Sequence, residues 1–250
     1  MVAWMHDLTA DRRQRTAVKD KRTKTNNKEK TRSEILRRFA MRFSGKIFGI
    51  LFMVIFSVHS FAKIGLGADV VSRYIWRGTD LGGSVSVQPV LSYTAGLLEV
   101  GAWGSYSLTD RGANENDLYL TYSLGELGIT VTDYYFPETM DVFDYSSDAG
   151  IHWIEASLCY TLGKFSLLTA FFFSGDPEDS KYFELTYNFY ENEAVSASLI
   201  IGAGDGVYLV DSERLNIVNI GLKTSSGPLS VSYILNPQAE TNFLVFGYSF

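Results

Sequence analysis

Few side chains in this chain of 250 residues could carry out covalent chemistry. A serine nucleophile needs a general base, usually histidine, within hydrogen-bond reach. His152 is the candidate base, with Ser146 and Ser147 nearby in the sequence, because the other histidines precede the cleavage site of an export signal described below. No spacing brings a serine within reach of His152, which adjoins Trp153. A histidine in an aromatic belt is therefore favoured over a lipid-modifying enzyme, and we expect no enzymatic activity.

Acidic residues are dense in the long connections between the strands predicted below. Carboxylate oxygens could hold Ca²⁺ or bridge to lipopolysaccharide through divalent cations, but no connection has the EF-hand spacing. Solvated loops that repel anions at the mouth are favoured, and we expect no metal and no cofactor. The acids are Asp110, Glu115, Asp117, Glu138, Asp141, Asp144, Asp148, Asp176, Glu178, Asp179, Asp205, Asp211 and Glu213.

A third set of residues shares the polar face of the predicted strands and would line an enclosed interior. The candidates among them for a lumen constriction are Arg73, Glu99, Trp103, Glu155 and Glu184. Arg73 with Glu99 and Glu155 could form a charged constriction that sorts solutes, as charged rings do in pores. An internal ion-pair network that plugs the interior is the alternative. Both stay open, because a barrel of about twelve strands lies between filled eight-stranded barrels and open sixteen-stranded channels.

The elements that must position these residues are strands. Runs of about ten residues are apolar at every second position and are separated by turn residues. In the segment YFELTYNF, Phe183 and Leu185 share one face, and Glu184 and Thr186 share the other. Twelve strands are predicted, at about 66–76, 86–94, 97–107, 117–124, 127–136, 151–161, 164–173, 180–190, 193–203, 214–223, 228–235 and 241–250.

The connections between these strands alternate between short turns and long loops. Transmembrane β-barrels have this asymmetry, an even number of strands, and strands of nine to eleven residues. Such a sheet must close, because lipid leaves open edges unpaired. A secreted β-sandwich is the alternative, but its outward positions should be polar. The sequence therefore predicts an all-β fold, a transmembrane antiparallel up-and-down barrel of about twelve strands.

Aromatic residues gather near the strand ends, as they do in the girdles at the two membrane interfaces. The predicted outer girdle contains Tyr74, Trp76, Tyr134 to Phe136, Trp153, Phe171 to Phe173, Tyr182 and Phe183. The predicted inner girdle contains Tyr160, Phe189, Tyr190, Tyr248 and Phe250.

The last strand shows Leu244, Phe246, Tyr248 and Phe250 on one face and ends on Phe250. This pattern resembles the C-terminal signature of bacterial outer-membrane barrels, which the membrane-assembly machinery reads. The resemblance implies a Gram-negative host, a location in the cell outer membrane, and these four residues as the assembly signal.

The N-terminal part differs from the rest in charge. Residues 1–40 carry 12 Lys and Arg against 5 Asp and Glu, whereas residues 63–250 carry 8 against 23. The first segment is polar, basic and without apolar periodicity, so we expect a disordered extension, with translation starting at Met41 as our hypothesis. It has no interleaved aromatic residues, and we expect no nucleic-acid partner.

Residues 41–62 read as a secretory signal peptide. Arg42 and Lys46 precede a ten-residue apolar run, and Ser60 and Ala62 supply small residues for cleavage after Ala62. The apolar run is short for a membrane-spanning helix. The mature barrel would then be residues 63–250. Its one cysteine, Cys159, excludes an intrachain disulfide.

The start of the mature chain resembles the TorF-type porin family of outer-membrane barrels. The resemblance rests on Ser72 to Gly78 (SRYIWRG), Gln88-Pro89 and Trp103-Gly104-Ser105. It implies a porin-like channel for passive diffusion of small hydrophilic solutes, and it brings no family catalytic residues to carry over to this chain. From the acidic loops we expect a weak preference for cations. The expected partners are the lipid bilayer, lipopolysaccharide, the assembly machinery and the solutes. A closed structural or adhesive barrel with binding loops is the alternative.

Overall fold

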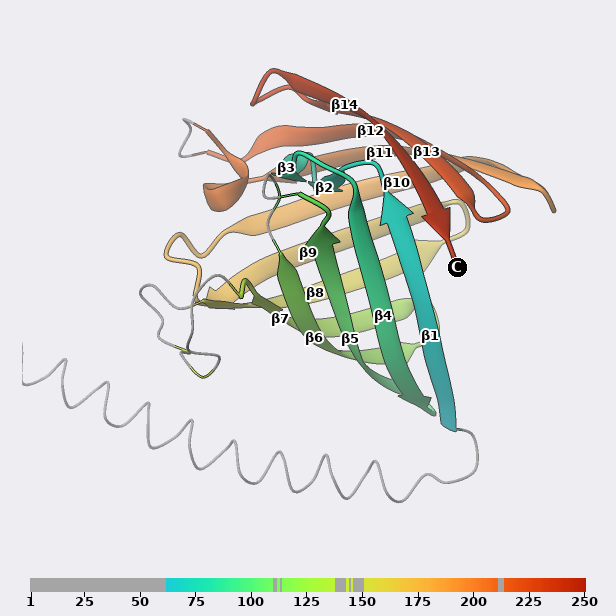
Figure 1. The fold of residues 1–250 in the computed structure, drawn as a ribbon, viewed down its shortest axis with the longest axis horizontal. Coiled ribbons are helices and arrows are strands. Elements are labelled where there is room, and N and C mark those ends of the chain that lie inside the picture. The colour runs from blue at the N-terminus through green and yellow to red at the C-terminus, as the bar shows by residue number, and fades with distance from the viewer. Residues whose placement is uncertain are drawn as a thin grey trace, which may run out of the picture. The chain divides into compact units, whose positions relative to one another are not determined.

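The computed structural model describes residues 62–109, 112, 114–137, 143, 145, 151–210 and 214–250. They form a closed antiparallel barrel of twelve strands (Figure 1), which confirms the predicted fold. The predicted extension and the signal peptide up to residue 61 lie outside the described residues. The barrel strands are β1 (Ala62–Val71), β4 (Ser86–Ala95), β5 (Leu98–Ser107), β6 (Glu115–Leu124), β7 (Leu127–Tyr135), β8 (His152–Leu162), β9 (Phe165–Ser174), β10 (Lys181–Glu191), β11 (Val195–Gly204), β12 (Asn216–Ser226), β13 (Leu229–Asn236) and β14 (Thr241–Ser249).

The barrel is apolar outside, because successive side chains of a strand point to opposite faces. On β10, Phe183 and Leu185 are exposed on the outer face, whereas Tyr182 is fully buried inside. Leu118 on β6 and Leu167 on β9 are likewise exposed. The outer surface of the barrel wall thus consists largely of exposed apolar side chains, as the alternation predicted.

The two ends of the barrel differ. At one end the strands are joined by tight turns with glycines at positive φ, namely Gly96, Gly125, Gly163 and Gly227. We call it the short-turn end, and the opposite end the long-loop end. Strand β1 begins and β14 ends at the short-turn end.

The first predicted strand, 66–76, is wrong as a single element. β1 ends at Val71, and the chain then forms a separate two-stranded hairpin of β2 (Tyr74–Trp76) and β3 (Thr79–Gly82). Its turn residues, Arg77 and Gly78, both have positive φ, which is typical of a type I′ turn. Val70 and Val71 are both apolar, as are Tyr74, Ile75 and Trp76. Periodicity therefore could not show where the chain leaves the wall.

The barrel closes through a short seam. β1 pairs with β4 over ten residue pairs but with β14 over three, from Asp69–Ser249 to Val71–Gly247. Two further backbone hydrogen bonds extend the seam, from Ser72 N–H to the Phe246 carbonyl and from Phe250 N–H to the Ala68 carbonyl.

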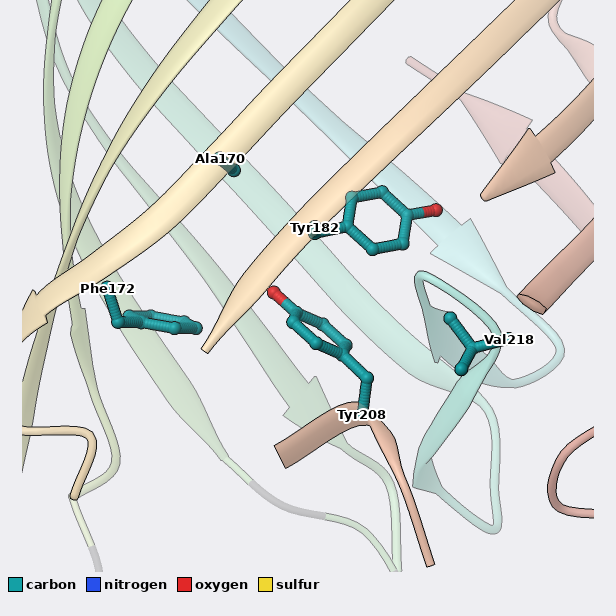
Figure 2. Packing of buried hydrophobic residues seen from close by; sticks show 5 residues of the cluster. All are labelled: Ala170, Phe172, Tyr182, Tyr208 and Val218. Carbon is teal, nitrogen blue, oxygen red and sulfur yellow. The ribbon is translucent and has the colours of Figure 1, made fainter. Parts of the chain in front are cut away.

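A hydrophobic core fills the lumen toward the long-loop end. Figure 2 shows five of its buried residues, Ala170, Phe172, Tyr182, Tyr208 and Val218. Tyr208 belongs to the short 3₁₀ helix η1 (Gly206–Tyr208), which follows β11. Trp76, Tyr134 and Trp153 pack against this cluster. Within the part of the chain that the structure describes, no helix is long and apolar enough to cross a membrane.

This core corrects the predicted outer girdle. Tyr74, Trp76, Tyr134, Trp153, Phe172 and Tyr182 belong to the interior, whereas Phe171, Phe173 and Phe183 are exposed outside. Neighbouring residues such as Phe171 and Phe172 point in opposite directions, so proximity to a strand end did not determine the face. The five residues of the predicted inner girdle are all exposed.

Candidate functional site in the barrel lumen

The tip of the β2–β3 hairpin is held inside the barrel by an ion pair. Arg77 Nη1 and Nη2 donate to Glu155 Oε2 and Oε1 on β8, at 2.5 and 2.8 Å. Nη1 also donates to the Tyr208 hydroxyl at 2.5 Å. The side chains of Arg77 and Glu155 are 11% and 2% exposed. A two-pronged pair of this kind fixes orientation as well as position.

Aromatic rings surround the same guanidinium. Its carbon lies 4.6 Å from the Trp76 ring centroid, 4.7 Å from Tyr182 and 5.8 Å from Tyr208. These distances are suited to cation–π attraction. Burial acts to lower the pKa of Arg77, but the hydrogen bond with Glu155 and the electrostatic attraction of Tyr208, Glu155 and Tyr134 together raise it. Burial also raises the pKa of Tyr208, so the tip is a cation among neutral phenols and one carboxylate.

Because Gly78 has no side chain, the hairpin turn can lie directly against strand β12 of the barrel wall. Its φ is 85°, and an added Cβ would collide with the Val218 carbonyl of β12. The Asn236 side chain of β13 donates to the Gly78 carbonyl at 3.1 Å. The hairpin tip therefore contacts β8 on one part of the wall and the neighbouring strands β12 and β13 on another. It closes the lumen at this level.

The base of the hairpin covers a buried acidic pair. Tyr74 packs on Trp103 of β5 at a centroid distance of 5.6 Å, and burial together with Glu115 raises the pKa of Tyr74. Glu115 and Asp117 are 1% and 6% exposed, each with one carboxylate oxygen that has no hydrogen-bond partner. The prediction that these two acids lie in solvated loops is wrong, because both belong to β6 and face inward.

Two other acidic residues of the long connections accept hydrogen bonds from backbone N–H groups. Asp176 is buried and accepts hydrogen bonds from the backbone N–H groups of Glu178 and Ser180. Asp205 accepts one from the backbone of Lys181. Asp110, Glu138, Asp141, Asp144, Asp148, Asp211 and Glu213 lie outside the described residues.

The predicted constriction of Arg73, Glu99 and Glu155 does not form. Arg73 leaves the wall with the hairpin, pairs with Asp80 at 2.5 Å and lies over Phe243. Glu155 binds Arg77 instead. Glu99 lies near the short-turn end, where it accepts hydrogen bonds from Thr94 and Tyr119.

The remaining predicted lumen residues lie at different heights. Glu184 accepts hydrogen bonds from Tyr182 and Thr186 on its own strand, β10. Trp103 lies under the hairpin base against Tyr74. The predicted set thus shares the inner face but does not form one ring.

The half of the lumen near the short-turn end is open to water. Lys63 on β1, Cys159 on β8 and Lys223 on β12 share the inner face of their strands and are exposed. In the long-loop half, by contrast, inner residues such as Glu155 and Val218 are buried, at 2% and 0% exposed. The lumen is therefore a polar vestibule that the hairpin closes at one end.

Arg77 and Tyr208 are the residues that the prediction of lumen candidates missed. Arg77 follows an aromatic residue and precedes a glycine (Trp76-Arg77-Gly78), a pattern that could have indicated a turn with a functional cation. Tyr208 lies in a long connection, where no periodicity assigns a face.

His152 lies on the outer face of β8 and is 5% exposed. Its Nδ1 is 2.8 Å from Asp133 Oδ1, and its ring stacks between Tyr135 and Tyr145. Ser146 and Ser147 lie outside the described residues. No group of three or more potential metal-ligating side chains occurs among the described residues.

The residues of the predicted assembly signal lie on the outer face of β14. Leu244, Phe246, Tyr248 and Phe250 are 57%, 53%, 42% and 77% exposed. Their side chains are therefore available to a partner from outside, while the backbone of Phe250 completes the seam.

Strand pairing and lumen define the class of this protein, a closed twelve-stranded β-barrel with an internal hairpin plug. The chain belongs to the Gcw_chp family, described as bacterial proteins of unknown function, whose model matches residues 58–244. No curated protein matches the sequence.

Several solved structures are similar to this chain. A loop-deletion mutant of OmpT, an outer membrane protein of Vibrio cholerae, is 13% identical, with a TM-score of 0.36 and 76% of each chain covered. A double mutant of the Rh. blastica porin is 11% identical, with a TM-score of 0.35, covering 76% of this chain and 99% of the porin. At this level of similarity, the fold assignment rests on the strand pairing of this chain itself.

Proposed function

We propose that this protein is a narrow porin-like channel of the bacterial outer membrane that rests closed. The observation that carries the proposal is the lumen, which is polar and water-exposed on one side and closed by a single hairpin on the other. Barrel closure and the apolar outer wall support the membrane location, since no backbone edge can stay unpaired in lipid. The resemblance to TorF-type porins points the same way.

The hairpin is the part of the plug that can move. It belongs to a sheet of its own and is joined to the wall through Ser72–Arg73 on one side and the residues after Gly82 on the other. The Arg77–Glu155 pair holds it in place. Release of this pair would open a path for small hydrophilic solutes. The excess of acidic residues over basic ones in residues 63–250 favours cations in that path.

Single-channel conductance in a planar bilayer tests this function. The wild-type barrel should show rare, brief openings, because the plug is seated in most molecules. Glu155→Gln removes the charge that holds Arg77 and should give long-lived open steps, with a cation-selective reversal potential under a salt gradient. Glu99→Gln is the control, because Glu99 lies in the open half away from Arg77, and its openings should stay rare.

Two results would count against the channel. If the wild type and Glu155→Gln both insert and both stay silent, the barrel is closed, which favours the structural or adhesive alternative. If wild type and Glu155→Gln conduct equally, the hairpin does not gate the lumen.

A further inference from the structure

The site that holds the Arg77 guanidinium is built mainly by parts of the chain outside the hairpin. Glu155 belongs to β8, Tyr182 to β10 and Tyr208 to η1, and all three side chains are buried. Figure 2 shows Tyr182 and Tyr208 reaching into the lumen from these two elements. We call Glu155, Tyr182 and Tyr208 the guanidinium site. Because none of the three belongs to the hairpin, the site would persist if the hairpin moved away.

The contacts at this site match the shape of a guanidinium group. Glu155 accepts one hydrogen bond from each terminal nitrogen of Arg77, at 2.5 and 2.8 Å. The Tyr208 hydroxyl accepts a third at 2.5 Å, and the Tyr182 ring centroid lies 4.7 Å from the guanidinium carbon. A guanidinium is a planar fork that binds both carboxylate oxygens and stacks on aromatic rings, whereas an ammonium group is a compact point charge. The site therefore distinguishes between these two kinds of cation.

A vacated guanidinium site would contain a buried carboxylate without a counter-charge. The Tyr134 hydroxyl donates to Glu155 Oε1 at 3.3 Å, but a neutral donor does not replace a cation. Loss of the partner of a buried charge is costly, so departure of the hairpin is unfavourable unless another cation replaces Arg77. A solute that binds only the vacated site would shift the equilibrium toward the open barrel.

The polar vestibule gives solutes a route to the site. Cys159 is exposed on the inner face of β8, four residues along the strand from Glu155. Four residues of strand span about 13 Å, so the water-filled half of the lumen begins a short distance from the carboxylate. The acidic excess of residues 63–250 favours cations along this route.

We propose that the lumen binds small solutes that carry a guanidinium group, as the side chain of free arginine does. Such a solute replaces Arg77 at Glu155 and thereby stabilises the open barrel. In the closed barrel, Arg77 occupies the site as a tethered guanidinium. The proposal rests on the movable plug of the proposed function and names the class of solute that the plug responds to.

Calorimetry on an emptied site tests the binding. The full chain carrying Arg77→Ala is refolded into detergent micelles and titrated with methylguanidinium chloride. One probe per barrel should bind, about tenfold more tightly than methylammonium. Arg73→Ala is the matched control, because Arg73 lies beside the same hairpin. Its pair with Asp80 is partly exposed, at 40% and 29%, so the emptied position should show no measurable binding.

A double variant locates the bound probe. Arg77→Ala combined with Glu155→Gln keeps the space but removes the carboxylate, and methylguanidinium binding should be lost. Binding that persists in the double variant would overturn the site. A folded Arg77→Ala barrel that does not bind methylguanidinium would overturn it too, and equal affinity for methylammonium would overturn the guanidinium class.

Conductance of the wild type tests the opening and does not depend on the folding of a variant. In the planar bilayer, millimolar methylguanidinium chloride should raise the frequency of openings about tenfold over the same concentration of methylammonium chloride. Glu155→Gln should show the same openings in both salts, because it lacks the carboxylate. Equal opening frequencies of the wild type in both salts would overturn the replacement of Arg77.

The two proposals can fail separately. If Arg77→Ala binds methylguanidinium but neither it nor the wild type conducts, the channel is overturned and the binding site stands. If the wild type conducts equally in both salts and folded Arg77→Ala binds no probe, the guanidinium site is overturned and the channel stands.

Discussion

At the scale of residues, the lumen contains buried carboxyl groups of two kinds, one paired with a cation and two without a basic partner. Glu155 is paired with Arg77 and hydrogen-bonded on both oxygens. Glu115 and Asp117 lie together without a basic partner. Burying a charge is costly unless it is paired, so the same substitution, carboxylate to amide, should have different consequences at the two sites.

Replacing Glu155 should destabilise the barrel. Glu155→Gln leaves the guanidinium of Arg77 buried without its counter-charge, and breaking a buried pair in this way typically costs about 3–5 kcal/mol. The free energy of unfolding, measured by urea titration of the barrel in lipid vesicles, should fall by that order. A change smaller than about 1 kcal/mol, within the range of exposed pairs, would mean that the pair is not buried in solution.

Replacing Asp117 should be tolerated. Asp117→Asn removes one of two adjacent buried acids, and its amide can donate a hydrogen bond to Glu115, which has an unpartnered oxygen. The same urea titration should show a free energy of unfolding equal to or above that of the wild type. A loss as large as that of Glu155→Gln would show that Asp117 has a favourable partner in the native barrel.

At the scale of elements, the hairpin depends on one glycine more than on its strands. Gly78 and Gly96 both adopt positive φ, but a Cβ at Gly78 would meet the wall of β12, and one at Gly96 would meet nothing within 4 Å. Both alanine substitutions carry the backbone cost of about 1–2 kcal/mol. Gly78→Ala alone should unseat the hairpin.

Conductance separates these two variants. In the planar bilayer, Gly78→Ala should show channel openings at least tenfold more frequent than the wild type, and Gly96→Ala should match the wild type. Equal behaviour of the two variants would contradict a steric fit of the hairpin tip against β12.

The seam between β1 and β14 is the other sensitive element. Deletion of Phe250 removes both its hydrogen bond to Ala68 and its exposed ring, whereas Phe250→Ala removes the ring alone. The deletion should reduce refolding into vesicles, measured by the heat-modifiable shift in electrophoretic mobility. Phe250→Ala should refold as wild type but reach the outer membrane of cells in smaller amounts. Normal amounts in cells would contradict the assembly signal.

At the scale of the whole molecule, the lumen has one open and one closed end. Cys159 is exposed on the inner face of β8, four residues along the strand from Glu155 toward the short-turn end. A small hydrophilic thiol reagent should modify it rapidly from the short-turn side and slowly from the long-loop side. Gly78→Ala should raise the slow rate. Equal rates from both sides in the wild type would contradict the plug.

The alternation of side chains along each strand made most of this architecture predictable from the sequence. A strand exposes alternate residues to lipid and to the lumen, so a period of two fixes both the strand and its faces. Eleven of the twelve predicted strands match barrel strands within a few residues at each end. The inner face of Glu99, Trp103, Glu155 and Glu184 followed from the same alternation.

The existence and position of the hairpin plug could be seen only in the tertiary structure. Residues 66–76 alternate less cleanly than most of the other strands, and no cluster of turn residues marks the point after Val71 where the chain leaves the wall. The inward hairpin is stabilised by its contacts and not by its own pattern. Arg77 reaches Glu155, 78 residues along the chain, and alternation assigns a face without assigning a partner across the lumen. The sequence thus determines the wall and its two faces, while the enclosed packing of the barrel determines which inner residues meet and where the lumen closes.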